Sequence, residues 1–224
     1  MYSVLVVRIA RDELDLTARA RIRDAAIECF AEDGFGAPFR TIAGRAGVSP
    51  GLITHHFGSK DVLRDECDTE VLRRYRDLKT DAVDHPSAYL TSALTDPGTA
   101  PSLLVYLLRA VAAGGPGAAR FLDRLVEDMR PVMAHGVATG FLRPSRDEEA
   151  RLRYLAHQTI GAMLVQFLTT PDVTPAQFVA SLSSRPREVV LPMLEVFTEG
   201  YIADRTMLDE YVQRLGEPIP PERS

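Results

Sequence analysis

The sequence lacks any hydrophobic run long enough to cross a membrane. A membrane-spanning helix needs about 20 consecutive apolar residues, and none of the apolar stretches in these 224 residues approaches that length. The apolar segment from Val4 to Val7 is too short for a secretory signal, and no basic segment precedes it. We therefore expect a protein that stays in the cytoplasm.

Cysteine is scarce, and the usual signatures of catalysis are missing. Cys29 and Cys67 have no zinc-type spacing and cannot build a disulfide framework, so we expect two reduced, buried thiols. The sequence contains no nucleophile elbow, phosphate-binding loop, paired metal ligands or glycine-rich dinucleotide signature. These absences argue against an enzyme and predict neither a cofactor nor a metal.

Acidic residues are absent from one long stretch, although the whole chain carries a net charge of −5. Residues 1–80 contain 13 basic and 13 acidic side chains, so the excess of acid lies entirely in residues 81–224. The segment from Gly34 to Lys60 contains Arg40, Arg45 and Lys60 without a single Asp or Glu. Because DNA binding depends on the local charge, this stretch is typical of a surface that faces phosphates.

Four helices are predicted in the first 80 residues. Thr17 can cap a first helix that stops at Gly34, and a second helix runs from Pro38 to Gly47. Ser49 caps a third, with Pro50 in its first turn and Gly58 at its end, and Ser59 caps a longer fourth helix. Two short helices joined through Gly47 and Val48 and braced by longer ones predict a helix-turn-helix in a three-helix bundle.

The remainder of the chain is also predicted to be helical, which makes the fold class all-α. Proline and glycine clusters divide it at regular intervals, and the apolar positions between them follow helical spacing. The segments Ser102–Ala113 and Ile160–Leu168 are apolar around almost their whole circumference. The last helix carries the apolar stripe Val190, Leu194, Phe197, Tyr201, Leu208, Val212 and Leu215, interrupted by Gly200 and Asp204.

A set of short motifs between Arg21 and Leu63 resembles the DNA-binding domain of TetR-family regulators. In chain order these are Ala25-Ala26 to Phe30, Gly34-Phe35, Ile42-Ala43, Ala46-Gly47-Val48-Ser49, Gly51 and His56-Phe57-Gly58-Ser59-Lys60. Farther along, the turn Gly140-Phe141-Leu142-Arg143-Pro144 also resembles a common family feature. Their order and spacing make the resemblance specific, whereas each motif alone would be weak.

The resemblance implies that the segment from Ser49 to Phe57 is the recognition helix, with its N-terminus against the bases. It also implies that Arg40 reaches a guanine edge and that Lys60 holds a phosphate. Thr54 replaces the family's usual phosphate-binding tyrosine, and His55 is a possible substitute. The predicted DNA-binding residues are Arg40, Ser49, Pro50, Gly51, Leu52, Thr54, His55 and Lys60.

The resemblance implies the following organisation: an N-terminal arm (1–16), a DNA-binding domain (17–63), a connecting helix (59–79), a helical effector-binding and dimerisation domain (80–216) and a tail (217–224). We expect a repressor that binds an inverted-repeat operator in double-stranded DNA as a homodimer and is released by a small-molecule effector. The alternative is a helical protein-interaction module with a degenerate helix-turn-helix. The pair His55 and His56 is not expected to bind a metal, because neighbours on a helix point about 100° apart.

Two further sets of residues are predicted from the C-terminal helices. Polar side chains in apolar helices are candidates for an effector pocket, although each can equally be a satisfied core group; they are Tyr106, Arg109, His135, Tyr154, His157 and Gln166. The stripe around Phe197 can be either core or dimer seam. We expect a dimer in which the Ile160–Leu168 helix and the last helix pair with their mates, through Ile160, Leu164, Leu194, Phe197 and Tyr201.

Overall fold

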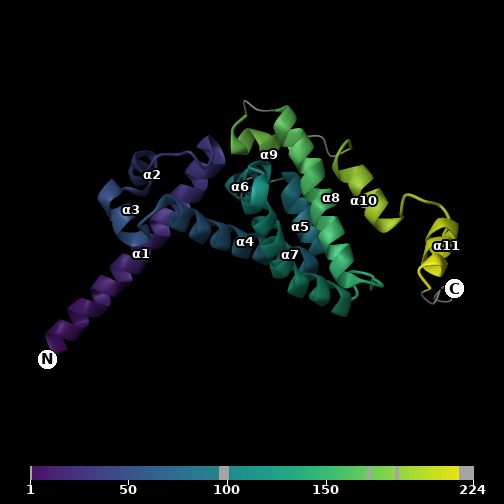
Figure 1. Cartoon of the computed structure of the whole chain (residues 1–224), viewed down its shortest axis with the longest axis horizontal. Coiled ribbons are helices and arrows are strands. Elements are labelled where there is room, and N and C mark those ends of the chain that lie inside the picture. The colour runs from purple at the N-terminus through teal and green to yellow at the C-terminus, as the bar shows by residue number, and fades with distance from the viewer. Residues whose placement is uncertain (1, 96–100, 171–172, 185–186, 217–224) are drawn as a thin grey trace. The chain divides into compact units, whose positions relative to one another are not determined.

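The computed structural model describes residues 2–95, 101–170, 173–184 and 187–216, and of residues 2–16, 93–95 and 183 it describes the backbone alone. Within these ranges the chain is helical and forms no strand (Figure 1). The predicted all-α class is confirmed. None of the described helices is both long and apolar enough to span a membrane. The predicted tail, 217–224, lies outside the described residues.

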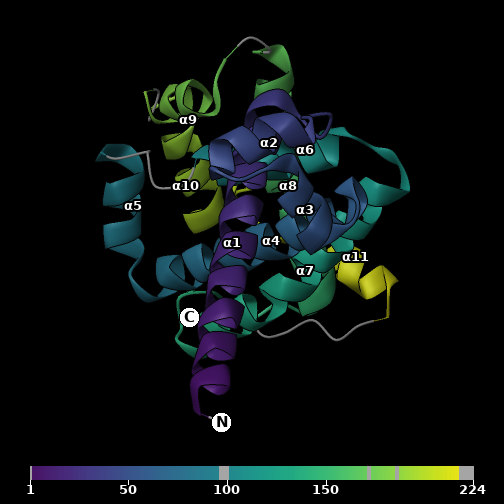
Figure 2. The ribbon, with the colours of Figure 1, turned by 90° about the vertical axis from the view of Figure 1, so that its left-hand side faces the viewer.

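The helix-turn-helix consists of α2 (Phe39–Ala46) and α3 (Pro50–Phe57), which lie beside α1 (Tyr2–Asp33) in Figures 1 and 2. Gly47 ends α2 with a φ of +65°, a left-handed conformation that residues other than glycine rarely adopt. Ser49 caps α3 as expected, because its Oγ accepts a hydrogen bond of 3.3 Å from the Leu52 N–H. The longer α4 (Lys60–Asp84) begins at the expected cap, Ser59.

The predicted start of the first helix at Thr17 is wrong. Thr17 lies inside α1, which runs from Tyr2 without interruption. Residues 2–16 contain neither glycine nor proline, so nothing in the backbone chemistry stops a helix there, and a good capping residue inside a helix does not by itself start one. The N-terminal arm is thus an extension of α1.

The helices α5 (Pro86–Thr95), α6 (Pro101–Ala112), α7 (Gly115–Ala138), α8 (Glu148–Thr169) and α9 (Pro175–Ser183) follow. The central one is α6, which contacts α1, α4, α7, α8 and α9. As expected, it is buried on most sides. The larger of two hydrophobic clusters among the described residues runs from the helix-turn-helix through α6 to α8 and α9. Its fully buried side chains include Phe30, Ile53, Leu63, Tyr106 and Phe178.

The described chain divides into two compact units, one up to Ser183 and one from Ser184. The second, the C-terminal unit, contains α10 (Val190–Thr198) and α11 (Thr206–Arg214). The expected single last helix is therefore two helices. Gly200 has a φ of +89°, and the Asp204 carboxylate accepts a hydrogen bond of 2.9 Å from the Thr206 N–H at the start of α11. Gly200 thus follows the end of α10, and Asp204 satisfies a free N–H group at the start of α11.

Candidate DNA-binding site

The N-terminus of α3 is exposed to solvent. Ile53 and Phe57 anchor α3 in the core and are at most 3% exposed. The side opposite these anchors is open to solvent, and of the predicted contact residues there, Ser49, Pro50, Gly51, Thr54 and His55 are exposed and Leu52 is half-buried. A capped N-terminus with free backbone N–H groups and no acidic residue in its first turn suits an anionic partner.

Arg40 and Lys60 lie at the starts of the helices that flank this surface. Arg40 is exposed on the first turn of α2, and among the described residues its guanidinium makes no hydrogen bond or ion pair. Lys60 begins α4, and its Nζ donates a hydrogen bond of 3.1 Å to the Gly36 carbonyl. An ammonium group carries three donors, so Lys60 can keep this bond and still contact a phosphate.

Arg45 contributes less positive charge to this surface than the sequence indicates. Its guanidinium pairs with Glu32 and lies 3.7 Å from Glu28, both on α1. The hydrogen bond to Glu32 raises the pKa of Arg45. The acid-free segment Gly34–Lys60 therefore lies against acids that come from outside it, and its unpaired basic charge is concentrated at Arg40 and Lys60.

The histidines on α3 differ in exposure. His55 is exposed, whereas His56 is half-buried and its backbone carbonyl accepts a hydrogen bond of 2.6 Å from the Arg19 guanidinium. Their rings meet edge to face, with centroids 5.6 Å apart. Among the described residues, no group of His, Cys, Asp and Glu side chains is arranged to hold a metal ion. The Thr54 hydroxyl bonds the Pro50 carbonyl at 3.4 Å.

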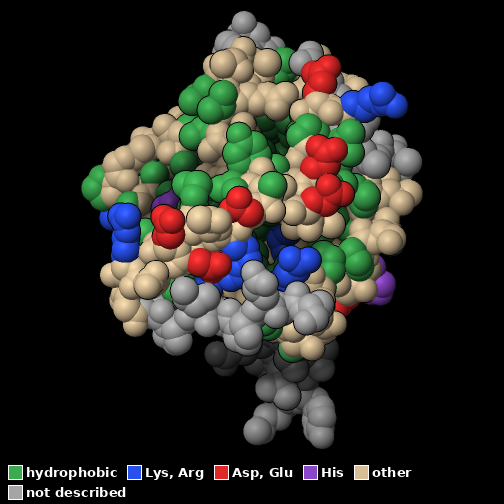
Figure 3. Space-filling view, turned by 90° about the vertical axis from the view of Figure 1, so that its right-hand side faces the viewer, with side chains coloured by type: hydrophobic (Ala, Val, Ile, Leu, Met, Phe, Trp, Pro, Cys, Tyr) green, Lys and Arg blue, Asp and Glu red, His purple; other side chains and the backbone are tan. Residues whose placement is uncertain are grey.

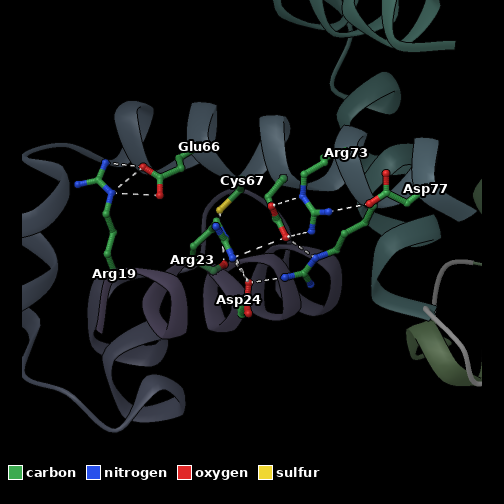
Figure 4. Close-up of polar contacts among 9 residues, drawn as sticks. Arg19, Arg23, Asp24, Glu66, Cys67, Arg73 and Asp77 are labelled. Atoms are coloured by element: carbon green, nitrogen blue, oxygen red, sulfur yellow. Dashed lines mark hydrogen bonds and ion pairs between the residues drawn. The ribbon is translucent and has the colours of Figure 1, made fainter. Parts of the chain in front are cut away.

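A network of ion pairs joins α1 to α4 behind the helix-turn-helix (Figure 4). Glu70 is 8% exposed and faces Arg23, Arg73 and Arg74. Hydrogen bonds from Arg73 lower the pKa of Glu70 to about 2. Arg74 also bonds Asp24 of α1 at 2.6 Å. Cys67, beside this network, is buried, as is Cys29, which confirms the expected buried thiols.

A polar contact between α6 and the end of α1 could not be predicted from the sequence. Arg109 of α6 donates hydrogen bonds of 2.8 Å each to the carbonyls of Ala31 and Glu32, in the last turn of α1. Its guanidinium also lies 5.6 Å from the ring centroid of Phe167 on α8. The ring of Phe35, just after α1, meets Tyr106 edge to face at 5.2 Å. The DNA-binding helices are thus attached directly to the larger helical part.

Comparison with known proteins decides the family. The chain is 40% identical over 200 residues to the HTH-type transcriptional regulatory protein RaaS of Mycobacterium tuberculosis, covering 88% of this chain and 93% of that protein. The chain belongs to the TetR family. Residues 22–67 match the description "Bacterial regulatory proteins, tetR family", and residues 99–203 match "Tetracyclin repressor-like, C-terminal domain". This TetR-family chain is accordingly a DNA-binding transcriptional regulator.

Solved structures agree on the fold. A TetR-family regulator from Rhodococcus sp. is 20% identical, with a TM-score of 0.53 over 77% of this chain and 97% of that one. FadR from Bacillus subtilis, solved in complex with stearoyl-CoA, is 18% identical, with a TM-score of 0.53 over 82% and 99%. These likenesses support an N-terminal helix-turn-helix and a larger helical C-terminal part in this TetR-family regulator.

The six residues predicted for an effector pocket do not converge. Tyr106 is buried and its hydroxyl bonds Asp68 at 2.5 Å, while Arg109 binds the end of α1. Tyr154 and His157 lie on the exposed side of α8. His135 pairs with Asp84 at 2.6 Å and lines an open cleft of about 380 Å³ between α4 and α7. Gln166 is half-buried. Three of the six therefore hydrogen-bond other protein groups, and two lie at the surface.

A larger open cleft, about 580 Å³, lies where α1, α4 and α6 meet. It is lined by Asp24, Ile27, Glu28, Arg74, Leu78, Pro101, Ser102 and Leu103. None of the predicted pocket residues is among them. No sequence pattern indicates this cleft, because its lining comes from three helices that are distant along the chain.

The two predicted interface residues on α8 lie on its core side in the single chain. Ile160 is 8% exposed and belongs to the core, and Leu164 is half-buried against it. The exposed apolar side of α8 carries Tyr154, Val165 and Leu168 instead, each more than 60% exposed. In the C-terminal unit, Leu194, Phe197 and Tyr201 are 37%, 53% and 89% exposed. Figure 3 shows hydrophobic side chains, in green, at the surface on one side of the chain.

Proposed function

We propose that this TetR-family regulator is a homodimeric repressor that reads an inverted-repeat operator through α3 and is released by a small-molecule effector. The observation that carries the proposal is the capped, solvent-exposed N-terminus of α3, with Arg40 and Lys60 beside it and acidic residues absent from its first turn. In this proposal Ser49, Pro50, Gly51 and Leu52 approach base edges, and Thr54, His55 and Lys60 approach phosphates.

The homodimer is supported by the exposed apolar side of α8. Tyr154, Val165 and Leu168 recur at helical spacing with the small residues Gly161 and Ala162 between them, so a second copy of α8 can approach closely and bury the same surface on both chains. A two-fold dimer presents two recognition helices, and we therefore expect half-sites about 34 to 36 Å apart, one helical turn of DNA. Footprinting that shows one asymmetric half-site bound by a monomer contradicts the dimer.

The small-molecule effector is supported by the open clefts between helices that connect to the helix-turn-helix, and by the fold it shares with a regulator solved with stearoyl-CoA. An effector that favours one arrangement of these helices changes operator affinity by its difference in affinity for the two arrangements.

The experiment that tests DNA reading by α3 starts from duplexes selected from the promoter region beside the chain's own gene. Binding of the selected operator and of a random duplex is titrated against salt for the parent protein and for Lys60→Ala. Loss of one phosphate contact should weaken both complexes and lower the slope of log affinity against log salt by about one unit. A parent protein without salt-dependent DNA binding is the result expected of a protein-interaction module.

A further inference from the structure

Arg19 on α1 holds the C-terminal end of α3. Its Nη1 donates a hydrogen bond of 2.6 Å to the carbonyl of His56, in the last turn of α3. The last carbonyls of a helix have no partner within it, and they carry the negative end of the helix dipole. A guanidinium group at this end of α3 supplies both a donor and a positive charge.

The guanidinium is itself fixed by two other groups. The Glu66 carboxylate on α4 accepts hydrogen bonds of 2.9 and 3.1 Å from the Arg19 Nε and another bond from Nη2 (Figure 4). The Cζ atom of the guanidinium lies over the ring of Phe57, the last residue of α3, 4.6 Å from the ring centroid. Bidentate pairing and a cation–π contact together define the position of an arginine far better than a single contact does.

These contacts add polar anchors to the apolar ones of α3. It is eight residues long; Ile53 and Phe57 are buried, and Leu52 is partly buried against the same core. The apolar anchors of this two-turn helix therefore all lie toward the core, and Arg19 acts at its C-terminal end. An error of about 1 Å in a recognition element is enough to spoil its polar contacts.

We propose that Arg19 is a positioning residue for DNA recognition: clamped by Glu66, it sets the angle at which α3 presents its N-terminus to the operator. This inference rests on the proposed role of α3 as the recognition helix. It assigns Arg19 no contact with DNA, because its charge is offset by Glu66 and each of its three nitrogens already donates a hydrogen bond to a protein group.

The test compares Arg19→Gln with Arg21→Gln, a neighbouring exposed arginine of α1. Affinity for the selected operator and for a random duplex is measured for both variants across a salt series, with thermal unfolding of each. We expect Arg19→Gln to lose about tenfold or more in operator affinity while its random-duplex affinity and salt slope stay those of the parent. Arg21→Gln should keep the parent's ratio of operator to random-duplex affinity.

A second readout separates positioning from folding. Hydrogen exchange of the amides of residues 54–58 in the DNA-free protein should quicken in Arg19→Gln. Glu66→Gln, which keeps Arg19 but weakens its clamp, should shift both readouts in the same direction. If Arg19→Gln does not fold, Arg19→Lys is used, and it should also lose operator affinity, because one ammonium cannot reproduce the bidentate pair together with the cation–π contact on Phe57.

Three results would overturn the inference. Operator affinity equal to the parent's denies any role to Arg19. Equal losses on operator and random duplex, with a salt slope lower by about one unit, would make Arg19 a phosphate contact. Parent-like exchange at residues 54–58 would deny the link to α3. If Lys60→Ala and Arg40→Ala also leave DNA binding unchanged, the assignment of α3 to DNA fails rather than the clamp alone.

Discussion

At the scale of single residues, the DNA surface depends on which basic side chains remain unpaired. Arg40, Arg45 and Lys60 look equivalent in the sequence, yet Arg45 is neutralised by Glu28 and Glu32 from α1. Arg40 keeps an unpaired guanidinium among the described residues. Of the three, Arg40 is therefore the side chain best suited to reading a base.

Arg40→Ala should cost about 1 to 3 kcal/mol of operator binding, and the preference should relax at one base pair in each half-site. The reason is that a bidentate contact to a guanine edge is lost without a change elsewhere in the protein. Binding to a panel of operators with single base-pair changes measures this. Arg45→Ala is the matched control and should leave the base preference intact. A uniform loss over the panel would make Arg40 a phosphate contact instead.

Glu70 makes stability depend on pH. Its folded-state pKa is lowered from 4.5 to about 2, first of all by hydrogen bonds from Arg73. A lowered pKa stabilises the fold above the unfolded-state value, and this contribution is lost as the pH falls from about 4.5 toward 2. We expect a loss of roughly 2 to 3 kcal/mol over that interval.

Chemical unfolding at pH 6, 4 and 2.5 measures this contribution. Glu70→Gln should be less stable than the parent at pH 6, because three arginines then face no buried carboxylate, and its stability should depend less on pH. Glu149→Gln removes an exposed partner of Arg130. The Arg130 hydrogen bond lowers the pKa of Glu149 as well, but solvent screens this surface pair, so the variant should change the pH dependence far less than Glu70→Gln. Identical pH profiles for the parent and Glu70→Gln would contradict the prediction.

At the scale of helices, the most consequential joint is the one that Arg109 makes between α6 and α1. Two charge-assisted hydrogen bonds to the carbonyls of Ala31 and Glu32 satisfy the end of α1. Arg109→Met keeps the apolar stem and removes both bonds, so we expect a loss of about 2 to 4 kcal/mol in unfolding free energy. Amides near residues 30–36 should also exchange faster.

The control for Arg109 is Arg120→Met. Arg120 is an exposed arginine on α7, and exposed substitutions away from such features usually change stability by less than about 0.5 kcal/mol. If Arg109→Met lowers the unfolding free energy no more than this control, the Arg109 hydrogen bonds do not contribute to stability, and the contact of α6 with α1 rests on apolar packing alone.

Helix boundaries with local causes could be predicted from the sequence. Ser49 and Ser59 cap α3 and α4 as expected, and Gly47 ends α2, because caps and left-handed turns depend on neighbouring residues alone. The start of α1 could not be predicted, since Thr17 is a capping residue that sits inside a helix. Gly200 and Asp204 indicate an interruption of the last helix, but they do not predict that it separates two helices, α10 and α11.

The orientation of α8 and the partners of buried polar groups could not be predicted. A helix that is apolar on all sides has no pattern that distinguishes core from surface. The sequence therefore places Ile160 and Leu164 in the dimer interface, whereas in the structure both pack toward the core. Likewise, nothing near Tyr106 or Arg109 in the sequence points to Asp68 or to the carbonyls of α1. Such pairings are long-range, and only the packed helices reveal them.

At the scale of the whole molecule, the exposed side of α8 is where we expect assembly. Val165→Glu places a charge at the centre of a surface that the proposed dimer buries, and it should give monomers with strongly reduced operator affinity, at a cost of several kcal/mol. Light scattering and operator titration measure the two effects. Phe141→Glu, which changes an exposed aromatic in the turn between α7 and α8, is the control and should remain a dimer.

The C-terminal unit needs a separate trial because its apolar side chains are exposed on different helices. Phe197→Glu should likewise weaken the dimer if this unit contributes to assembly. A Val165→Glu protein that stays dimeric with unaltered operator affinity would remove α8 from the interface, and the same result for Phe197→Glu would remove the C-terminal unit.

The core shared by the helix-turn-helix and α6 restricts how such a regulator can be recombined. Phe35 contacts Tyr106, and Arg109 hydrogen-bonds the last carbonyls of α1. The helix-turn-helix is therefore not an independently folding domain. A fragment ending at Leu63 would expose the surface that α6 covers and should be largely unfolded. A chimera can join this helix-turn-helix to the larger helical part of another regulator. We expect it to fold and bind DNA only when the new α6 has an arginine and an aromatic residue at the positions of Arg109 and Tyr106. Such domain exchange is thereby limited to relatives that have the same contact between α6 and the end of α1.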